Sequence, residues 1–324
     1  MRESAWLGID VGSVSTNLAA LNPDGELIYK AYIRSKGDPI GSVQLGLAEL
    51  EKAEKINVLG VGVTGSGRQL IASVVGGDVV KNEITAHAMA AINCCPDVQT
   101  VLEIGGQDSK LIIIRQGVAV DFAMNTVCAA GTGSFLDQQA DRLKIPIEKL
   151  GELALKAGAP VRIAGRCSVF AESDMIHKQQ IGHGLPEIIA GLCEALVRNF
   201  LNNLSKGKSL LPPFVFQGGV AANLGIKRAF ESALGHEIII PEHYGVMGAL
   251  GAALLVKEEM LEKQSVTKFR GFALADQTVR CESFECTQCA NHCEVIFLRI
   301  DGSLVAGWGD RCGRYQNGEG LRVG

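Results

Sequence analysis

The chain has 324 residues, of which 47% are hydrophobic and 20% charged, and its formal net charge is −4. This length predicts about two packed domains and excludes a small scaffold held together by disulfides. The slightly acidic balance excludes non-specific binding of nucleic acid through charge. Glycine is over-represented, with 39 residues where about 7% is usual, so we expect tight turns and phosphate-binding loops.

The sequence contains no segment that resembles a membrane span. The longest stretch without a formal charge, residues 209–226, contains two prolines, a glutamine and an asparagine, which a membrane helix would not tolerate together. The first ten residues lead into a strand pattern without an apolar signal region. We therefore expect a cytoplasmic protein with no membrane partner. Because cytosolic thiols are kept reduced, ten cysteines favour metal or redox chemistry over disulfides.

The first α/β unit is predicted over residues 1–95. In chain order its pattern indicates a strand at 6–10, a strand at 17–21, the Asn-Pro-Asp-Gly turn at 22–25, a third strand, a helix at 38–55, a strand at 56–63 and a helix at 82–95.

The same pattern restarts in a second unit, predicted over residues 96–263. Residues 98–114 read as a strand, a Gly-rich acidic turn and a strand, which echoes residues 5–34. The remaining elements are a strand at 117–122, helices at 131–143, 146–157, 168–180 and 184–205, a strand at 213–217, a helix after Gly219, a strand at 236–240 and a helix at 244–260, which can pack back on the first unit. This repetition predicts a duplicated α/β fold with a cleft between its halves.

Three Gly-rich turns are candidates for nucleotide binding. In the first, Asp10 ends a strand and is followed by small residues and hydroxyls that suit a phosphate chain, namely Gly12, Ser13, Ser15 and Thr16. The second combines glycines with groups that could hold Mg²⁺ or orient a water: Glu103, Gly105, Gly106, Gln107 and Asp108. The third follows an apolar strand and could let an adenosine lie against the backbone: Gly218, Gly219, Val220 and Asn223.

A Gly-rich hairpin alone is more often a simple turn, but two copies at the start of repeated strand sets favour phosphate binding. The sequence lacks the G-x-x-x-x-G-K-[ST] motif of P-loop proteins. Its one G-x-G-x-x-G run, residues 60–65, begins inside a predicted strand rather than in a βα turn, which disfavours a dinucleotide site.

These three turns resemble the phosphate-1, phosphate-2 and adenosine motifs of the acetate kinase, heat-shock chaperone and actin superfamily. Within it, the sequence resembles the ATPase activators of 2-hydroxyacyl-CoA dehydratases and the related benzoyl-CoA reductase ATPase subunits. The motifs that carry this resemblance are VTGSGR at 63–68, NEITAHA at 82–88, NTVCAAGTGSFLDQQA at 125–140 and AGRCSVFAESDMI at 164–176. The resemblance covers about residues 5–258 and implies a duplicated actin-like, ribonuclease H-like ATPase fold.

Cys128 and Cys167 lie 39 residues apart, each in a turn that leads into a predicted helix. Two isolated cysteines are usually buried apolar residues, but the family resemblance implies that this pair binds a [4Fe–4S] cluster. Such a cluster needs four thiolates, and a two-fold homodimer would supply them. The helix N-termini would then favour the anionic cluster.

Residues 264–324 are predicted to form a separate Cys-rich module with one hairpin, turning at Asp301-Gly302. Its five cysteines are close enough in sequence for a metal site, with Zn²⁺ and a second iron–sulfur cluster about equally compatible: Cys281, Cys286, Cys289, Cys293 and Cys312. A Cys-rich extension of this kind resembles longer members of the group, including the ATP-dependent reductases of double-cubane cluster proteins.

The resemblance implies an ATP-driven one-electron donor. Mg-ATP would bind in the cleft, with Asp10 and Asp108 on the metal and with Ser13, Ser15, Thr16 and Gln107 on the phosphates. A ferredoxin or flavodoxin would supply the electron, and an iron–sulfur enzyme would accept it. Two alternatives remain open at this point: a sugar or acid kinase of the same fold without a cluster, and a non-redox nucleotide switch whose tail Zn²⁺ mediates partner contacts.

Overall fold

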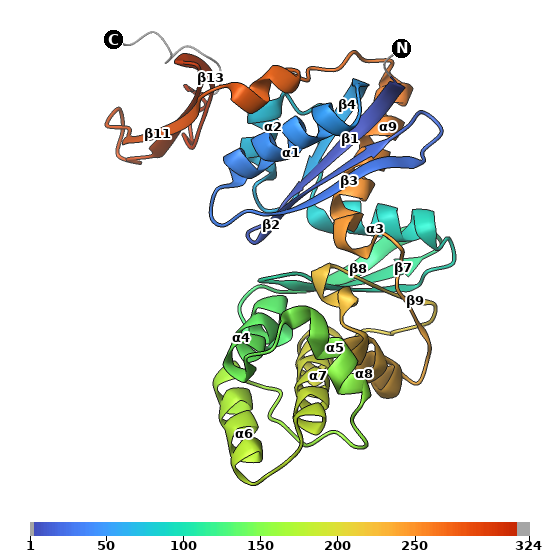
Figure 1. The fold of residues 1–324 in the computed structure, drawn as a ribbon. Coiled ribbons are helices and arrows are strands. Elements are labelled where there is room, and N and C mark those ends of the chain that lie inside the picture. The colour runs from blue at the N-terminus through green and yellow to red at the C-terminus, as the bar shows by residue number, and fades with distance from the viewer. Residues whose placement is uncertain (1–2, 316–324) are drawn as a thin grey trace. The chain divides into compact units, whose positions relative to one another are not determined.

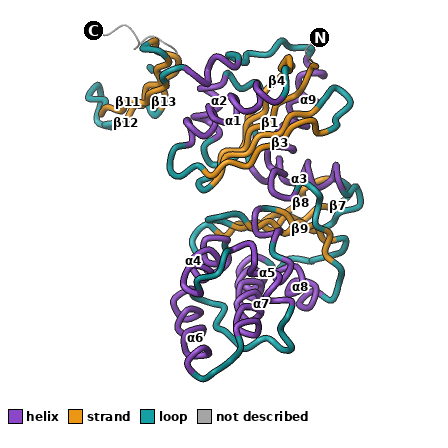
Figure 2. The backbone as a smooth tube through the Cα atoms, viewed as in Figure 1, coloured by secondary structure: helices purple, strands orange, loops and turns teal. Residues whose placement is uncertain are grey.

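Two five-stranded mixed sheets form the frame of the protein (Figures 1 and 2). The computed structural model describes residues 3–315. Their contacts group them into two compact units: unit 2 is Glu83–Gly251, and unit 1 combines the described residues up to Asn82 with those from Ala252 onward. The boundaries expected at 95/96 and 263/264 stay a prediction about folding domains.

Unit 1 begins with three antiparallel strands and continues with an α/β segment. Its elements before the crossing into unit 2 are β1 (Glu3–Val11), β2 (Ser15–Leu21), β3 (Leu27–Arg34), α1 (Pro39–Ala53), β4 (Ile56–Thr64), α2 (Arg68–Val75) and β5 (Val79–Val80). The sheet order is β3-β2-β1-β4-β5, with β4 parallel to both β1 and β5.

The core of unit 1 follows from the periodicity of its sequence. Helix α1 begins at Asp38, whose side chain accepts a hydrogen bond from the Gly41 amide at 2.8 Å. Along α1, Val43, Leu47 and Leu50 recur at helical spacing and are buried in one cluster with alternate residues of β1.

The return of the chain to unit 1 explains the G-x-G-x-x-G run. Helix α9 (Met247–Lys263) packs on β4, where a Cβ on Gly62 would lie 2.1 Å from the Ala252 carbonyl oxygen. A Cβ on Gly60 would contact Val256 and Met260. These two glycines therefore allow close helix–strand packing in unit 1.

Unit 2 repeats the same arrangement of strands. Its elements are α3 (Glu83–Cys94), β6 (Thr100–Ile104), β7 (Ser109–Arg115), β8 (Val118–Asn125), η1 (Ala129–Gly131), α4 (Gly133–Leu143), α5 (Ile147–Leu155), α6 (Ser168–Gln180), α7 (Leu185–Leu204), β9 (Phe214–Gln217), η2 (Gly219–Ala222), α8 (Leu224–Leu234), β10 (Ile238–Ile239), η3 (Tyr244–Val246) and the start of α9.

The strand order of unit 2 is β10-β9-β6-β7-β8, in which β6, β7 and β8 are antiparallel and β9 is parallel to β6 and β10. Read from the other edge, it matches the order in unit 1 strand for strand. The predicted duplication and the α/β class are therefore confirmed. The cleft between the halves stays a prediction.

The tail forms a three-stranded antiparallel sheet of β11 (Val279–Glu285), β12 (Glu294–Ile300) and β13 (Ser303–Trp308), after the short helix η4 (Phe272–Asp276). The predicted hairpin is β12–β13, and Asp301 and Gly302 both have positive φ angles at its turn. Leu274, Leu298 and Ile300 join the buried cluster of unit 1. The tail sheet thus shares part of the core of unit 1.

Among the helices of residues 3–315, none combines the length and the apolar character needed to cross a bilayer.

Candidate functional site

The phosphate-1 turn of unit 1 connects β1 and β2. Asp10 is half-buried near the end of β1, where it pairs with Asn17 across the hairpin. The turn is closed by a hydrogen bond from the Gly12 amide to the Ser15 carbonyl at 2.9 Å. Ser13 is exposed and Ser15 half-buried, so their hydroxyls are accessible to a ligand.

Thr16, by contrast, is fully buried, and its hydroxyl lies 3.2 Å from that of Ser35. The Thr16 side chain therefore stabilises the turn from the buried side and is not exposed to a ligand. The backbone N–H groups and the two serines of the turn are the groups that can bind an anion.

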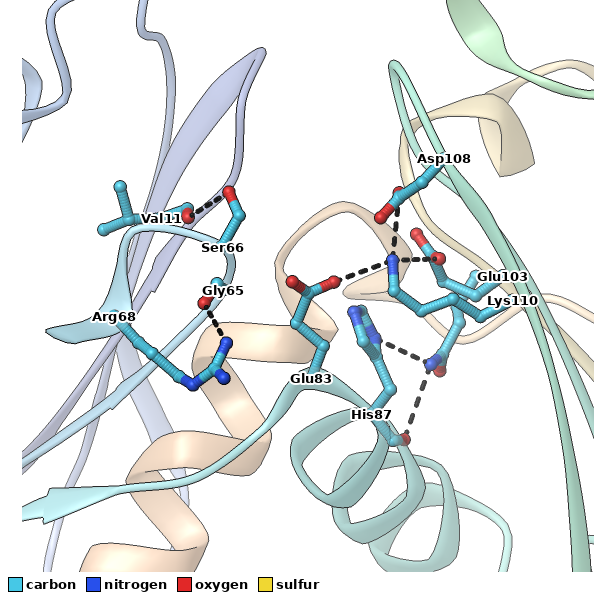
Figure 3. A network of polar contacts seen from close by, with 10 residues as sticks. Val11, Gly65, Ser66, Arg68, Glu83, His87, Glu103, Asp108 and Lys110 are labelled. Atoms are coloured by element: carbon cyan, nitrogen blue, oxygen red, sulfur yellow. Dashed lines mark hydrogen bonds and ion pairs between the residues drawn. The ribbon is translucent and has the colours of Figure 1, made fainter. Parts of the chain in front are cut away.

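A second loop of unit 1 contacts this turn. The Gly67 amide donates to the Val11 carbonyl at 2.9 Å. The Ser66 hydroxyl donates to the same oxygen at 3.4 Å (Figure 3). Arg68 folds back and donates to the Gly65 carbonyl at 3.0 Å. The VTGSGR motif thus stabilises the phosphate-1 turn through hydrogen bonds to the Val11 carbonyl.

The phosphate-2 turn of unit 2 connects β6 and β7 and contacts the N-terminus of α4. The Gly105 amide donates to the Asp108 carbonyl at 3.0 Å. The amides of Gly133 and Ser134 donate to the carbonyls of Gly105 and Gly106 at 2.9 and 2.8 Å. Gln107 is exposed at the tip of the turn, where it is accessible to a phosphate.

A buried lysine forms ion pairs with three carboxylates beside this turn. The Lys110 Nζ atom lies 2.9 Å from Glu103, 3.0 Å from Asp108 and 2.9 Å from Glu83 (Figure 3). The Lys110 side chain is 3% exposed, whereas that of Asp108 is 31% exposed. Asp108 is therefore the carboxylate of this cluster most open to a ligand.

The charges of this cluster are strongly coupled. Burial raises the pKa of Glu103 to about 7, although the Lys110 ammonium opposes this shift. Burial alone would lower the pKa of Lys110, but the three carboxylates outweigh it and raise that pKa. Lys110 is thus a permanent cation. Carboxylate oxygens are ligands that Mg²⁺ prefers, so the chemistry of Asp108 and Glu103 fits that metal.

The adenosine motif lies directly against the phosphate-2 strand within unit 2. Gly218 has a φ of 89°, and a Cβ there would lie 2.4 Å from the Ile104 carbonyl oxygen and 2.8 Å from the Glu103 carboxylate. Only glycine allows this approach. Gly219 and Val220 follow in η2, and the Asn223 side chain caps α8 by accepting from the Gly225 amide at 2.9 Å.

Unit 2 therefore brings together the second and third predicted loops, with Glu103, Gly105, Gly218 and Val220 in one neighbourhood. The first loop belongs to unit 1. A joint nucleotide site formed by all three loops stays a prediction.

The two core cysteines begin neighbouring helical segments of unit 2. Cys128 is the N-cap residue of η1, Cys167 is the N-cap residue of α6, and both are half-buried. The Cys128 Sγ atom lies 3.8 Å from the carbonyl oxygen of Arg166, the residue before Cys167. The fold thus brings the two cysteine loops together.

Two asparagines hold these loops. Asn199 of α7 is 2% exposed and donates to the Gly165 carbonyl at 2.6 Å and to the Cys128 Sγ atom at 3.5 Å. Asn125 donates to the Cys128 carbonyl at 2.8 Å and accepts from its amide at 2.9 Å. Sequence reasoning missed both residues, although for Asn199 a polar side chain at a core position of an apolar helix is a detectable signal.

The cysteine loops carry an exposed apolar surface. Val127, Val169 and Phe170 are 94%, 66% and 65% exposed, and each lies within three residues of one of the two cysteines. Large exposed apolar side chains gathered around potential metal ligands are typical of a surface that another protein covers.

The tail cysteines differ in their surroundings. Cys286 is buried with its Sγ atom 3.6 Å from the Tyr315 hydroxyl, Cys293 is half-buried, and the other three are exposed. Across residues 3–315, no group of three or more His, Cys, Asp or Glu side chains is arranged to hold a metal ion. A metal site formed by the tail cysteines stays a prediction.

The duplicated sheet, with a Gly-rich turn carrying a carboxylate after the first strand of each copy, defines the class of actin-like ATPases. More specifically, the chain belongs to the BadF/BadG/BcrA/BcrD ATPase family, whose model matches residues 7–256. The residues after 256, including the Cys-rich tail, lie outside that model. The family resemblance predicted from the sequence motifs is confirmed.

Named relatives match the chain over nearly their full lengths. It is 36% identical over 250 residues to the (R)-2-hydroxyglutaryl-CoA dehydratase activating ATPase of Acidaminococcus fermentans, covering 76% of this chain and 95% of that protein. It is 31% identical over 269 residues to the 2-hydroxyisocaproyl-CoA dehydratase activator of Clostridioides difficile, covering 81% and 98%.

Solved structures agree with these sequence relatives. The activator of the 2-hydroxyisocaproyl-CoA dehydratase from Clostridium difficile with bound ADPNP superposes with a TM-score of 0.73 at 30% identity, covering 80% of this chain and 97% of that one. The ethanolamine utilization protein EutJ from Carboxydothermus hydrogenoformans, at 17% identity and a TM-score of 0.51, covers 77% of this chain and 89% of that one and shares the fold.

Proposed function

We propose that the protein is an ATP-dependent one-electron donor that activates an iron–sulfur acceptor enzyme. Relatives named as activators of three different acyl-CoA dehydratases, at 31–36% identity, support an acceptor of the 2-hydroxyacyl-CoA dehydratase class. The Cys-rich tail also keeps a double-cubane cluster protein as a candidate acceptor.

The observation that carries this proposal is the pairing of the Cys128 and Cys167 loops. The two thiols lie at helical N-termini, and the buried Asn199 contacts the Cys128 thiol and the Gly165 carbonyl of the second loop, an arrangement that suits an anionic iron–sulfur cluster. When bound, a [4Fe–4S] cluster supplies reversible storage of one electron. The protein's contribution is to position the two thiolates and to exclude water through the apolar side chains around them.

A homodimer completes the ligand set. One chain offers two cysteines, and an isologous contact between two copies would bring four to one axis. The exposed Val127, Val169 and Phe170 surround the cysteines and would become buried in this contact. Burying these apolar side chains in the dimer contact would lower the free energy, because exposed apolar surface is unfavourable in water.

The nucleotide loops are assigned in the same scheme. We propose that Asp10 and Asp108 hold Mg²⁺ directly or through water. Ser13, Ser15 and Gln107 are open to phosphate oxygens. The backbone at Gly218 lies where only glycine fits, and we propose that Gly105, Gly106 and Gly219 likewise let the nucleotide approach the backbone. Thr16 and Asn223 contribute indirectly, because the Thr16 hydroxyl is hydrogen-bonded to Ser35 and the Asn223 side chain caps α8.

A ferredoxin or flavodoxin supplies the electron in this scheme, and no nucleic acid or membrane takes part. We place the protein in the cytoplasm because a reducing compartment suits its ten cysteines.

The experiment is anaerobic purification followed by analysis of iron and oligomeric state. We expect a dimer with about four iron atoms, which Cys128→Ala or Cys167→Ala removes. The matched control is Cys193→Ala, because this cysteine is buried in the core of unit 2, away from any proposed ligand set. Zn²⁺ or additional iron that is lost on Cys289→Ser would assign a metal to the tail.

Two results would contradict the proposal. If the purified protein were an iron-free monomer, neither the proposed cluster nor the proposed dimer would exist. A colourless protein that phosphorylates a sugar or an acid would instead support the kinase alternative.

A further inference from the structure

The NEITAHA motif at 82–88 has no role in the function proposed above. Its residues from Glu83 onward form the first turns of α3, the first element of unit 2. The chain crosses from unit 1 to unit 2 immediately before this helix and returns between Gly251 and Ala252. The motif is therefore located at a junction of the chain.

The first contact of the motif is with the phosphate-2 turn. Glu83 Oε2 lies 2.9 Å from Lys110 Nζ, and the same ammonium contacts Asp108 at 3.0 Å (Figure 3). Glu83 is thus separated from a proposed nucleotide-site carboxylate by one buried lysine. A change in the contacts of Lys110 would therefore alter its ion pair with Glu83 at the start of α3.

The second contact is with the adenosine motif. The Gln217 side-chain amide donates to His87 Nδ1 at 2.9 Å and lies 3.4 Å from the His87 carbonyl oxygen. Both side chains are buried, and Gln217 is the residue directly before Gly218. Because Glu83 and His87 are four residues apart, they lie on one face of α3.

The return crossing packs on the same turn of α3. A Cβ on Gly251 would lie 1.8 Å from the Ala86 carbonyl oxygen, so α9 and α3 are in direct backbone contact there. Within unit 2, the residues beside both crossings thus meet at the turn that carries Glu83 and His87.

We propose that Glu83 and His87 are positioning residues that transmit nucleotide occupancy of the phosphate-2 and adenosine loops to the two chain crossings. The inference rests on the proposed function only in requiring that these loops bind a nucleotide. A ligand shifts a conformational equilibrium only through contacts that differ between the states. Mg²⁺-nucleotide at Asp108 competes with Lys110 for that carboxylate, which changes the share of the ammonium available to Glu83.

The test is hydrogen–deuterium exchange of the full-length protein with and without Mg²⁺ and a non-hydrolysable ATP analogue. In the unmodified protein we expect slower exchange in two segments, the phosphate-2 hairpin at 103–110 and helix α3 at 83–94. In Glu83→Gln, the hairpin should keep its protection, while the nucleotide-induced protection of α3 should fall by about fivefold or more. Glu152→Gln, which breaks an exposed ion pair with Lys156 on α5, is the control and should behave like the unmodified protein.

A second pair of variants tests His87 in the same assay. His87→Asn keeps a side-chain acceptor for Gln217 and should preserve the response of α3, whereas His87→Leu should lose it. Rescue by asparagine separates positioning from a loss of packing.

The outcomes distinguish a failure of nucleotide binding from a failure of the coupling through Glu83 and His87. If nucleotide changes exchange in neither segment of the unmodified protein, nucleotide binding fails and the proposed function fails with it. If the hairpin responds but α3 in Glu83→Gln and His87→Leu responds as in the unmodified protein, this coupling inference is wrong and the proposed function stands.

Discussion

At the scale of single residues, the site depends on charged and polar groups that the fold has removed from water. The Lys110 ammonium contacts three carboxylates at once, so this buried cation is paired, although the cluster holds more carboxylates than cations. His87 is different, because burial lowers its pKa to about 3, and the nearby Lys110 adds to that shift. The ring is therefore neutral and accepts the Gln217 hydrogen bond at any pH near neutrality.

This shift predicts acid sensitivity. The folded-state pKa of His87 lies below the value of 6.5 for an unperturbed histidine, so between about pH 6.5 and 3 the unfolded chain binds a proton that the folded protein does not. Stability should fall as pH decreases through this window. From pH 6.5 to 5, His87→Asn should lose up to about 2 kcal/mol less than the unmodified protein. Urea unfolding at both pH values measures this, and equal losses in the two proteins would contradict it.

At the scale of elements, α7 organises the cysteine loops. Its apolar residues build the core of unit 2, where Phe230 of α8 contacts Phe200 of α7 and Phe216 of β9 at ring-centroid distances of 5.3 and 5.2 Å. On the same helix, Asn199 reaches both the Gly165 carbonyl and the Cys128 sulfur. One rigid helix thus fixes two loops that are distant in sequence.

Replacing Asn199 should loosen both loops. Asn199→Ala leaves the Gly165 carbonyl without its side-chain donor, which should cost about 1–3 kcal/mol of unfolding free energy. Iron should also be lost faster to a chelator than from the unmodified protein. Asn202→Ala, at an exposed position on the same helix, is the matched control. An unchanged rate of iron loss in Asn199→Ala would contradict the role assigned to this side chain.

At the scale of the whole molecule, the tail is tied to unit 1. The Gln44 side chain of α1 donates to the carbonyls of Leu274 and Gln277, each at 2.8 Å. Thr267 and the Lys268 amide both donate to Asp78, each at 2.7 Å. The segment between α9 and the tail sheet therefore joins unit 1 through hydrogen bonds, and the sheet itself joins it through the buried Leu298 and Ile300.

This attachment predicts that damage to the tail destabilises unit 1. Leu298→Ala removes a fully buried side chain from the shared cluster and should cost about 2–5 kcal/mol. Val266→Ala, at a position 87% exposed, should have little effect. Calorimetry of the full chain measures both. If Leu298→Ala produced a separate early transition and left the main one unchanged, the tail would be an independent unit.

Much of the fold was predictable because local periodicity survives in the sequence. Helix α6 begins and ends where the apolar pattern predicted, and the Asp301-Gly302 turn forms because both residues tolerate positive φ angles. Helix α2 was missed because its eight residues lie between glycines and are too few for a clear period. Strand β11 was missed because most of its residues are exposed and polar.

The sequence by itself determined the duplicated strand sets, the three Gly-rich turns and the cysteine motifs, because each depends on residues that are neighbours along the chain. Only the tertiary structure decided that Lys110 joins Glu83 to Asp108 and that Asn199 joins the two cysteine loops. Lys110 and Glu83 are 27 positions apart and Asn199 and Cys128 are 71 apart, and the strength of these contacts comes from burial, which no local pattern encodes. The tail's place in the core of unit 1 has the same origin, since an apolar side chain is buried by whichever surface the whole fold brings to it.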